Sequence, residues 1–150
     1  LISSLPTYLG NTELLEKRKV GFLASRKIST LSILPTLDWA MRACKQKDIV
    51  IVSGFHSKME RDVLKILLQG ECGIIVVLAR GMYRKLPKQY EEAMLQNRLL
   101  IISYEKESVI RVSEATAHKR NNYVREIADE FIDTLYGDIC TQSHLNNETS

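Results

Sequence analysis

The sequence of 150 residues has no apolar run long enough to cross a lipid bilayer and no signal peptide at its start. It has only three cysteines, widely spaced, and no C-x-x-C pair of the kind that holds a structural metal. These absences predict a cytoplasmic protein with reduced thiols, no metal, no cofactor and no membrane partner. Because the chain begins with Leu1 rather than Met, we expect it to belong to a longer product.

A large excess of charge of one sign is also absent, because the sequence has 21 basic and 18 acidic residues. Residues 1–136 nevertheless hold all 21 basic and 16 of the acidic residues, a net charge of +5, and only Asp138 and Glu148 are charged after Gly137. This distribution is compatible with a polyanionic ligand and argues against a strongly anionic role. With 45% hydrophobic and 26% charged residues, the composition is that of one globular domain.

Short apolar runs alternate with amphipathic segments along the chain. The runs predict buried strands at 20–24, 49–52, 74–78 and 99–103. The spacing of apolar residues predicts four helices. The first has an apolar stripe of Leu34, Leu37, Met41 and Cys44, with Pro35 in its first turn, and the second is opened by a Ser57–Glu60 capping box. The third is a short helix over 88–96, and the fourth runs from Thr116 to Gly137. Strands and helices in this order predict an α/β, Rossmann-like three-layer sandwich with a mostly parallel sheet of four to five strands. We expect a lead-in at 1–19, the domain at 20–136, and a polar tail at 137–150 whose residues 144–150 are frayed.

In such sheets the ligand crevice lies outside the carboxyl ends of the strands. That rule selects the segments 24–27, 53–56, 79–81 and 103–104. Small residues there admit a ligand to the backbone, and Arg26, Lys58 and Arg80 supply positive charge, so a phosphate would suit them. Ordinary turn composition explains the same residues, and neither a P-loop motif nor a G-x-G-x-x-G motif is present.

Other polar residues leave alternatives open. His56 is a base or ligand contact in one interpretation and an exposed loop histidine in the other, and no catalytic triad can be named. The 83–90 segment interleaves tyrosines with cations, which suits stacking on a single nucleic-acid strand, but the same tyrosines could pack on the sheet edge. Cys44 and Cys72 are interpreted as small core residues.

Several ordered motifs resemble those of the DNA-processing protein A family, also called Smf. Residues 8–15 (YLGNTELL) are similar to the family's Y-x-G-N-x-E-L-L, residues 20–26 (VGFLASR) to V-A-I-V-G-S-R, and residues 51–54 (IVSG) to V-V-S-G. Residues 75–87 resemble I-A-V-L-x-x-G-x-x-x-x-Y-P, residues 100–103 resemble L-L-I-S, and Arg120-Asn121 with Ala128-Asp129 fall where the family has R-N-R-x-I-x-x-L-S-D. The resemblance spans about residues 8–130.

The resemblance implies binding of single-stranded DNA in a basic pocket at the strand ends, a homodimer, and transfer of the strand to a RecA-type recombinase. It implies that Arg26 holds a phosphate, that Ser25, Ser53 and Gly54 line the pocket, and that Arg120 and Asn121 support it. Together with the strand-end rule, the predicted ligand-binding residues are Ser25, Arg26, Lys27, Ser53, Gly54, His56, Lys58, Arg80, Gly81, Arg120 and Asn121.

The chain departs from the family pattern in three places. The family's x-A-[RK]-G-I-D is replaced by residues 55–60 (FHSKME), and the first-loop glycine by Ala24. After Asp129 the spacing favours more helix, so we expect the family's later strands, and part of its dimer surface, to be missing.

The sequence therefore predicts a non-catalytic domain that binds a phosphate-bearing ligand, single-stranded DNA in the first hypothesis. A sensor or enzyme for a free nucleotide, and a protein-interaction module that has lost its ligand, are the alternatives.

Overall fold

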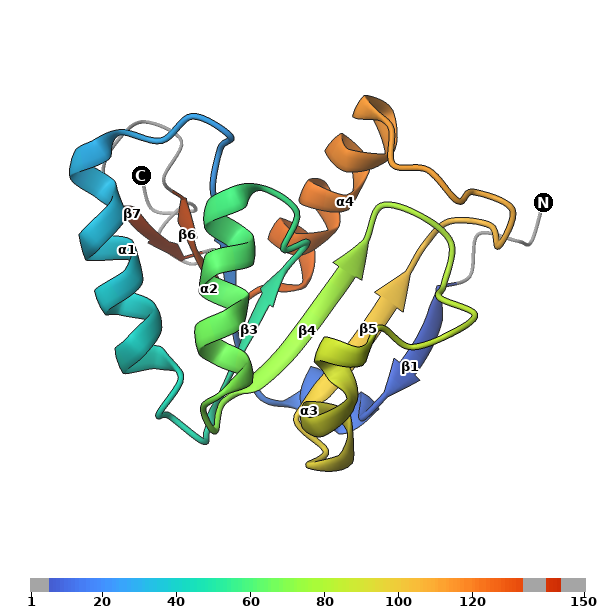
Figure 1. Cartoon of the computed structure of the whole chain (residues 1–150), viewed down its shortest axis with the longest axis horizontal. Helices are drawn as coiled ribbons and strands as arrows, with labels where there is room; N and C mark the ends of the chain where they lie inside the picture. Colours follow the sequence, from blue (N-terminus) through green and yellow to red (C-terminus); the bar gives the residue numbers. More distant parts are fainter. Residues whose placement is uncertain (1–5, 134–139, 144–150) are drawn as a thin grey trace.

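The computed structural model of the chain describes residues 6–133 and 140–143. The described strands form one sheet in the order β1-β5-β4-β3-β2-β6-β7 (Figure 1). Its centre is five parallel strands: β5 (Leu99–Ser103), β4 (Gly73–Leu78), β3 (Ile49–Ser53), β2 (Arg18–Leu23) and β6 (Glu130–Asp133). The edge strands β1 (Thr7–Gly10) and β7 (Cys140–Ser143) are antiparallel to their neighbours.

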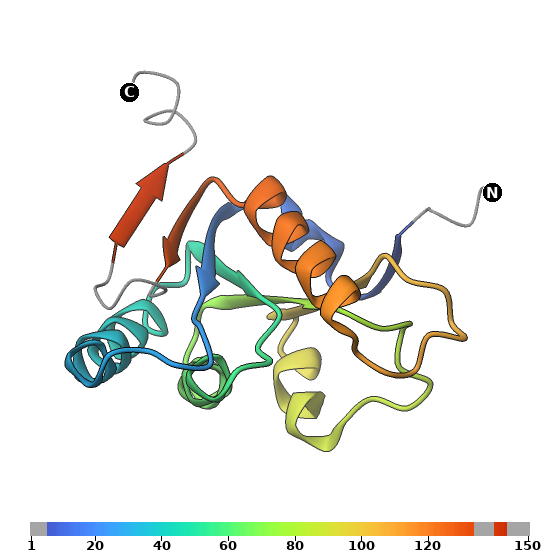
Figure 2. The ribbon, with the colours of Figure 1, turned by 90° about the horizontal axis from the view of Figure 1, so that it is seen from above.

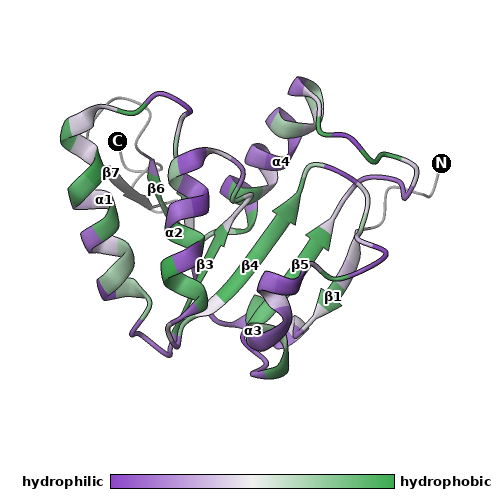
Figure 3. Ribbon diagram, viewed as in Figure 1, coloured by the Kyte–Doolittle hydropathy of each residue, from purple (hydrophilic) through white to green (hydrophobic). Residues whose placement is uncertain are grey.

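Helices cover both faces of the sheet, so the predicted three-layer α/β class is confirmed (Figure 2). On one face lie α1 (Thr30–Ala43), α2 (Lys58–Leu68), the turn η3 (Lys88–Tyr90) and α3 (Glu91–Leu95). On the other lie α4 (Glu114–Ile127) and the turn η2 (Thr12–Glu16). The strands β3, β4 and β5 are buried throughout, which explains their continuous apolar runs and their green colour in Figure 3.

The C-terminal helix prediction is wrong after Ile127. Ala128 has an extended backbone, and the Asp129 amide donates to the Lys19 carbonyl oxygen at 2.8 Å, which turns the chain back toward β2. β6 then pairs in parallel with β2. Gly21 in β2 lies opposite Phe131, and its lack of a side chain leaves room for that of Phe131. The expected loss of later strands is therefore also wrong, since β6 and β7 extend the sheet. The tail prediction for residues 144–150 lies outside the described residues.

The stripe predicted for α1 also needs correction. Leu34 and Met41 are exposed, whereas Thr36 and Ala40 face the core, and Pro35 is the sixth residue of the helix instead of standing in its first turn. The helix is positioned by Trp39, whose ring stacks on Phe22 with the centroids 5.1 Å apart. By contrast, α2 buries Met59, Val63, Leu64 and Leu67 as predicted.

Candidate nucleic-acid interface

The loop after β3 is held by the buried carboxylate of Glu60. Glu60 lies in the first turn of α2, is only 4% exposed, and forms the predicted capping box with Ser57. Its Oε1 accepts from the amides of His56 at 2.9 Å and Ser57 at 3.2 Å. Its Oε2 accepts from the Ala24 amide at 2.9 Å, in the loop after β2. One side chain therefore fixes two strand-end loops relative to each other.

A cavity of about 200 Å³, here called the β2 cavity, lies at this junction. It is lined from the β2 loop, the β3 loop and α4 by Leu23, Ala24, Ser25, Arg26, His56, Ser57, Glu60, Ala117, Arg120, Asn121 and Arg125. Arg26 is exposed and has no hydrogen-bond or ion-pair partner among the described residues. Three guanidinium groups thus surround one small opening, an arrangement suited to a phosphate.

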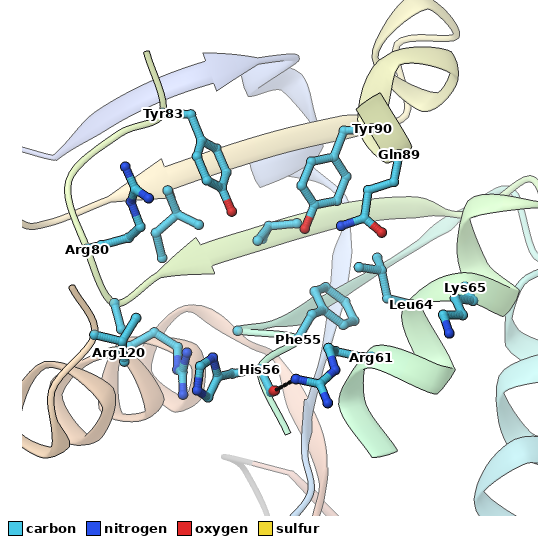
Figure 4. Close-up of a pocket in the computed structure, with 15 residues that line it drawn as sticks. Phe55, His56, Arg61, Leu64, Lys65, Arg80, Tyr83, Gln89, Tyr90 and Arg120 are labelled. Carbon is cyan, nitrogen blue, oxygen red and sulfur yellow. Dashed lines mark hydrogen bonds between the residues drawn. The ribbon is translucent and has the colours of Figure 1, made fainter. Parts of the chain in front are cut away.

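A second cavity of about 190 Å³, the β4 cavity, adjoins the first (Figure 4). Phe55, Leu64, Tyr83 and Tyr90 make its apolar walls, and the three aromatic rings among them converge on it in the close-up. Its charged lining residues are all basic: Arg61, Lys65, Arg80 and Arg120. Burial raises the pKa of both tyrosines, so their phenols are neutral at pH 7.

Arg120 belongs to both cavities. It projects from α4, is only 6% exposed, and donates from Nε to Oδ1 of Asn121 at 2.8 Å. Gly54 makes room for it, because a Cβ at that position would overlap three atoms of the Arg120 side chain. Burial lowers the pKa of Arg120, and the nearby Glu60 charge partly opposes that shift. An arginine remains protonated at neutral pH even so.

His56 places a titratable imidazole in this crevice. It lines both cavities, and burial, then the charge of Arg120, lowers its pKa, with Glu60 acting in the opposite direction. His56 is therefore mostly neutral at pH 7 and gains charge only in more acidic solution.

The structure brings most of the predicted ligand-binding residues together. Ser25, Arg26, His56, Arg120 and Asn121 line the β2 cavity, and Gly54, His56, Arg80 and Arg120 line the β4 cavity.

Four predicted residues line neither cavity. Ser53 is fully buried, and its hydroxyl accepts from the Phe55 amide at 3.0 Å, so it shapes the loop. Gly81 packs beneath the Lys106 carbonyl. Lys27 is exposed, and Lys58 is paired with Asp62 at 3.1 Å.

Other residues were not predicted for this site. Arg61 donates to the His56 carbonyl oxygen at 3.0 Å, and Arg125 reaches the β2 cavity while also lying 3.6 Å from an Asp133 oxygen. Arg61 follows the capping box by one residue, so its position near the strand end was a usable signal. Phe55 has a positive φ of 50°, which nothing in the sequence indicates.

The tyrosines of the 83–90 segment pack against the core of the domain, which agrees with the packing interpretation left open above. Stacking on a nucleic-acid strand stays a prediction. Tyr83 and Tyr90 lie against each other, with ring centroids 6.5 Å apart, and line the β4 cavity. The Arg80 guanidinium lies 5.0 Å from the Tyr83 ring centroid. Arg84 and Lys85 are exposed.

Within residues 6–133 and 140–143, no helix is both long and apolar enough to traverse a bilayer. The same part of the chain contains no group of three or more His, Cys, Asp or Glu side chains placed to bind a metal ion.

The fold and site define a Rossmann-like α/β domain with a basic crevice at the carboxyl ends of its parallel strands. The family model of DNA recombination-mediator protein A matches residues 4–134, and the chain belongs to that family. This membership supports a role in DNA processing.

Solved structures of the family share the fold. DNA processing protein A from Streptococcus pneumoniae superposes with a TM-score of 0.64 at 20% identity, over 85% of this chain and 45% of that one. DNA processing protein A from Helicobacter pylori, whose structure is described as giving insight into its single-stranded DNA binding mode, superposes with a TM-score of 0.65 at 20% identity, over 85% of this chain and 59% of that one. The chain thus spans less than two thirds of either protein. No curated protein sequence matches it significantly.

Proposed function

We propose that this domain binds single-stranded DNA, without chemistry of its own, in the crevice formed by the β2 and β4 cavities. The observation that carries the proposal is the convergence of Arg26, Arg120 and Arg125 on the β2 cavity, with Asn121 beside them. A backbone phosphate placed there would accept charge-assisted hydrogen bonds from guanidinium groups. The single-stranded DNA binding described for the Helicobacter pylori protein supports the same ligand class.

The first test is fluorescence anisotropy of labelled oligo-dT over a salt series. We expect binding by the wild type that weakens with salt, and a loss of about 10-fold or more in affinity for Arg26→Ala, because a charge-assisted hydrogen bond contributes about 1.5–3 kcal/mol. Arg26 is exposed and unpaired within the described chain, so the variant should fold normally.

Lys47→Ala is the matched control. Lys47 is an exposed cation paired with Glu71 at 3.3 Å, and it precedes β3, at the opposite end of the strands. Its removal should change oligo-dT affinity less than about 2-fold. Absence of binding by the wild type at low salt would contradict the proposal.

A free nucleotide is the second candidate, favoured by the small size of the β4 cavity and its aromatic walls. Replacing Arg84 and Lys85 distinguishes the two ligands, because both cations are exposed and line neither the β2 nor the β4 cavity. Their replacement by alanine should weaken binding of a strand and leave binding of a mononucleotide unchanged. A protein-interaction module would tolerate Arg26→Ala. Transfer to a RecA-type recombinase and homodimer formation stay predictions from the family resemblance.

A further inference from the structure

The carboxylate of Glu60 occupies the place where a strand-end loop usually holds an anion. The amides of His56 and Ser57 point to it from the loop that opens α2, and the Ala24 amide points to it from the β2 loop. Backbone amides at the start of a helix, joined by a neighbouring loop, form a common phosphate site in α/β proteins. Here a buried side chain of the same chain fills that position.

We propose that Glu60 is a positioning residue: its carboxylate fills the backbone anion site of the crevice, so that a DNA phosphate is directed onto the side chains of Arg26 and Arg120. This inference rests on the proposed function for the part that concerns DNA. The part that concerns Glu60 and the three amides can be tested without DNA.

The charges around the site agree with a carboxylate held by the amides and a phosphate held by the arginines. Three amide donors hold the Glu60 carboxylate, and no ion pair joins it to Arg120 among the described residues, although its charge acts on Arg120 from nearby. The terminal nitrogens of Arg120 and the whole guanidinium of Arg26 therefore have no protein partner within the described chain. A phosphate that enters the β2 cavity meets free arginine donors and amides that are already occupied.

The experiment compares the melting temperature of variants in sodium phosphate and in sodium chloride at equal ionic strength. Glu60→Ala empties the amide site, so it should melt at a lower temperature than wild type in chloride and recover by about 4 °C or more in phosphate. The recovery should persist in Glu60→Ala/Arg26→Ala, because the amides supply the new contacts. In Arg26→Ala alone, any stabilisation by phosphate should be lost.

Ser57→Ala is the control for a merely structural role. It breaks the same capping box but leaves the Glu60 carboxylate in place, so it should destabilise the protein without a phosphate-specific recovery. If Glu60→Ala/Arg26→Ala responds to phosphate no more than Arg26→Ala, the inference is overturned.

Glu60→Ser covers the case in which the alanine variant does not fold. Its hydroxyl is polar but too short to reach the three amides, so it should show the same phosphate-selective stabilisation, and the absence of that stabilisation would overturn the inference. If the wild type does not bind oligo-dT but Glu60→Ala still recovers stability in phosphate, the proposed function is contradicted and Glu60 remains the occupant of the anion site.

Discussion

Gly54 shows how one missing side chain shapes the crevice. Its Cα lies so close to Arg120 that a methyl group would overlap the arginine side chain, which is held on its other side by Asn121. The family motif explains that a glycine stands here, but it does not explain that the glycine clears a path for an arginine from a helix 60 residues further along the chain. The position of Arg120 follows from packing.

Gly54→Ala should therefore displace Arg120. We expect a cost of about 1–3 kcal/mol in the free energy of unfolding, as for other overpacked sites, and weaker oligo-dT binding. In an Arg120→Ala background the same substitution should cost much less, because the clash is gone. Urea unfolding of the four proteins measures this difference, and equal costs in both backgrounds would show that Gly54 has another role.

His56 gives the crevice a pH dependence. Its pKa lies below 6.5 in the free protein because of burial and neighbouring arginines. A bound phosphate favours the charged imidazole and raises that pKa, so oligo-dT affinity should rise about 3- to 10-fold as the pH falls from 7.5 to 5.5. Anisotropy at constant ionic strength measures the profile, which should flatten in His56→Asn. An unchanged profile in that variant would assign the pH dependence to other groups.

The same lowered pKa affects folding with a defined sign. The unfolded chain binds the His56 proton more readily than the native chain, so the contribution of His56 to stability is present above about pH 6.5 and is lost as the pH falls below that value.

At the scale of elements, the sequence predicts the interior better than the edges. The central strands and α2 follow from apolar runs and a capping box, because both are local signals. The strand β6 does not. Phe131 and Ile132 are buried on opposite faces of the sheet, but Phe131 also follows Tyr123 and Ile127 at a four-residue spacing that imitates a helix. Its partner is β2, more than 100 residues away, so pairing overrides the local pattern.

The pairing of β6 makes Ile132 a core residue. It is 4% exposed and packs with the cluster beneath α1 and α2. Ile132→Ala should cost about 2–5 kcal/mol in the free energy of unfolding. Glu130→Ala, which removes the surface ion pair with Arg18, should cost about 1 kcal/mol or less. Similar costs for both variants would contradict a buried β6.

The candidate site was also predictable only in part from the sequence. The strand-end rule located both cavities, because the ends of parallel strands are fixed by the fold. It could not show that Lys58 turns away to pair with Asp62 while Glu60, two residues later, turns inward. The directions of these side chains depend on the helix that the capping box starts.

At the scale of the whole molecule, the modest net charge of +3 is less informative than its placement. The β4 cavity is lined by four cations and no carboxylate, and the β2 cavity by three arginines with one carboxylate that three amides bind, so cations outnumber the carboxylate there as well. An anion is therefore attracted to one end of the sheet without a large overall charge.

The number of phosphate contacts should appear in the salt dependence. If Arg26, Arg120, Arg84 and Lys85 each neutralise one phosphate, the slope of log K against log salt is about −2.8, because each contact with a single strand contributes about −0.7. Arg26→Ala should reduce the slope by about 0.7. A wild-type slope of only about −1.4 would indicate that Arg84 and Lys85 make no phosphate contact.

The central claim is that single-stranded DNA binds at the carboxyl ends of the parallel strands. A titration of ¹⁵N-labelled protein with oligo-dT, followed by amide chemical shifts, tests it most directly. We predict the largest shifts at Ala24–Lys27, Gly54–Ser57 and Asn121, and little change at Lys45–Asp48, at the other end of the sheet. Shifts concentrated at Lys45–Asp48 or along the exposed face of α1, with the strand-end loops unchanged, would contradict the account.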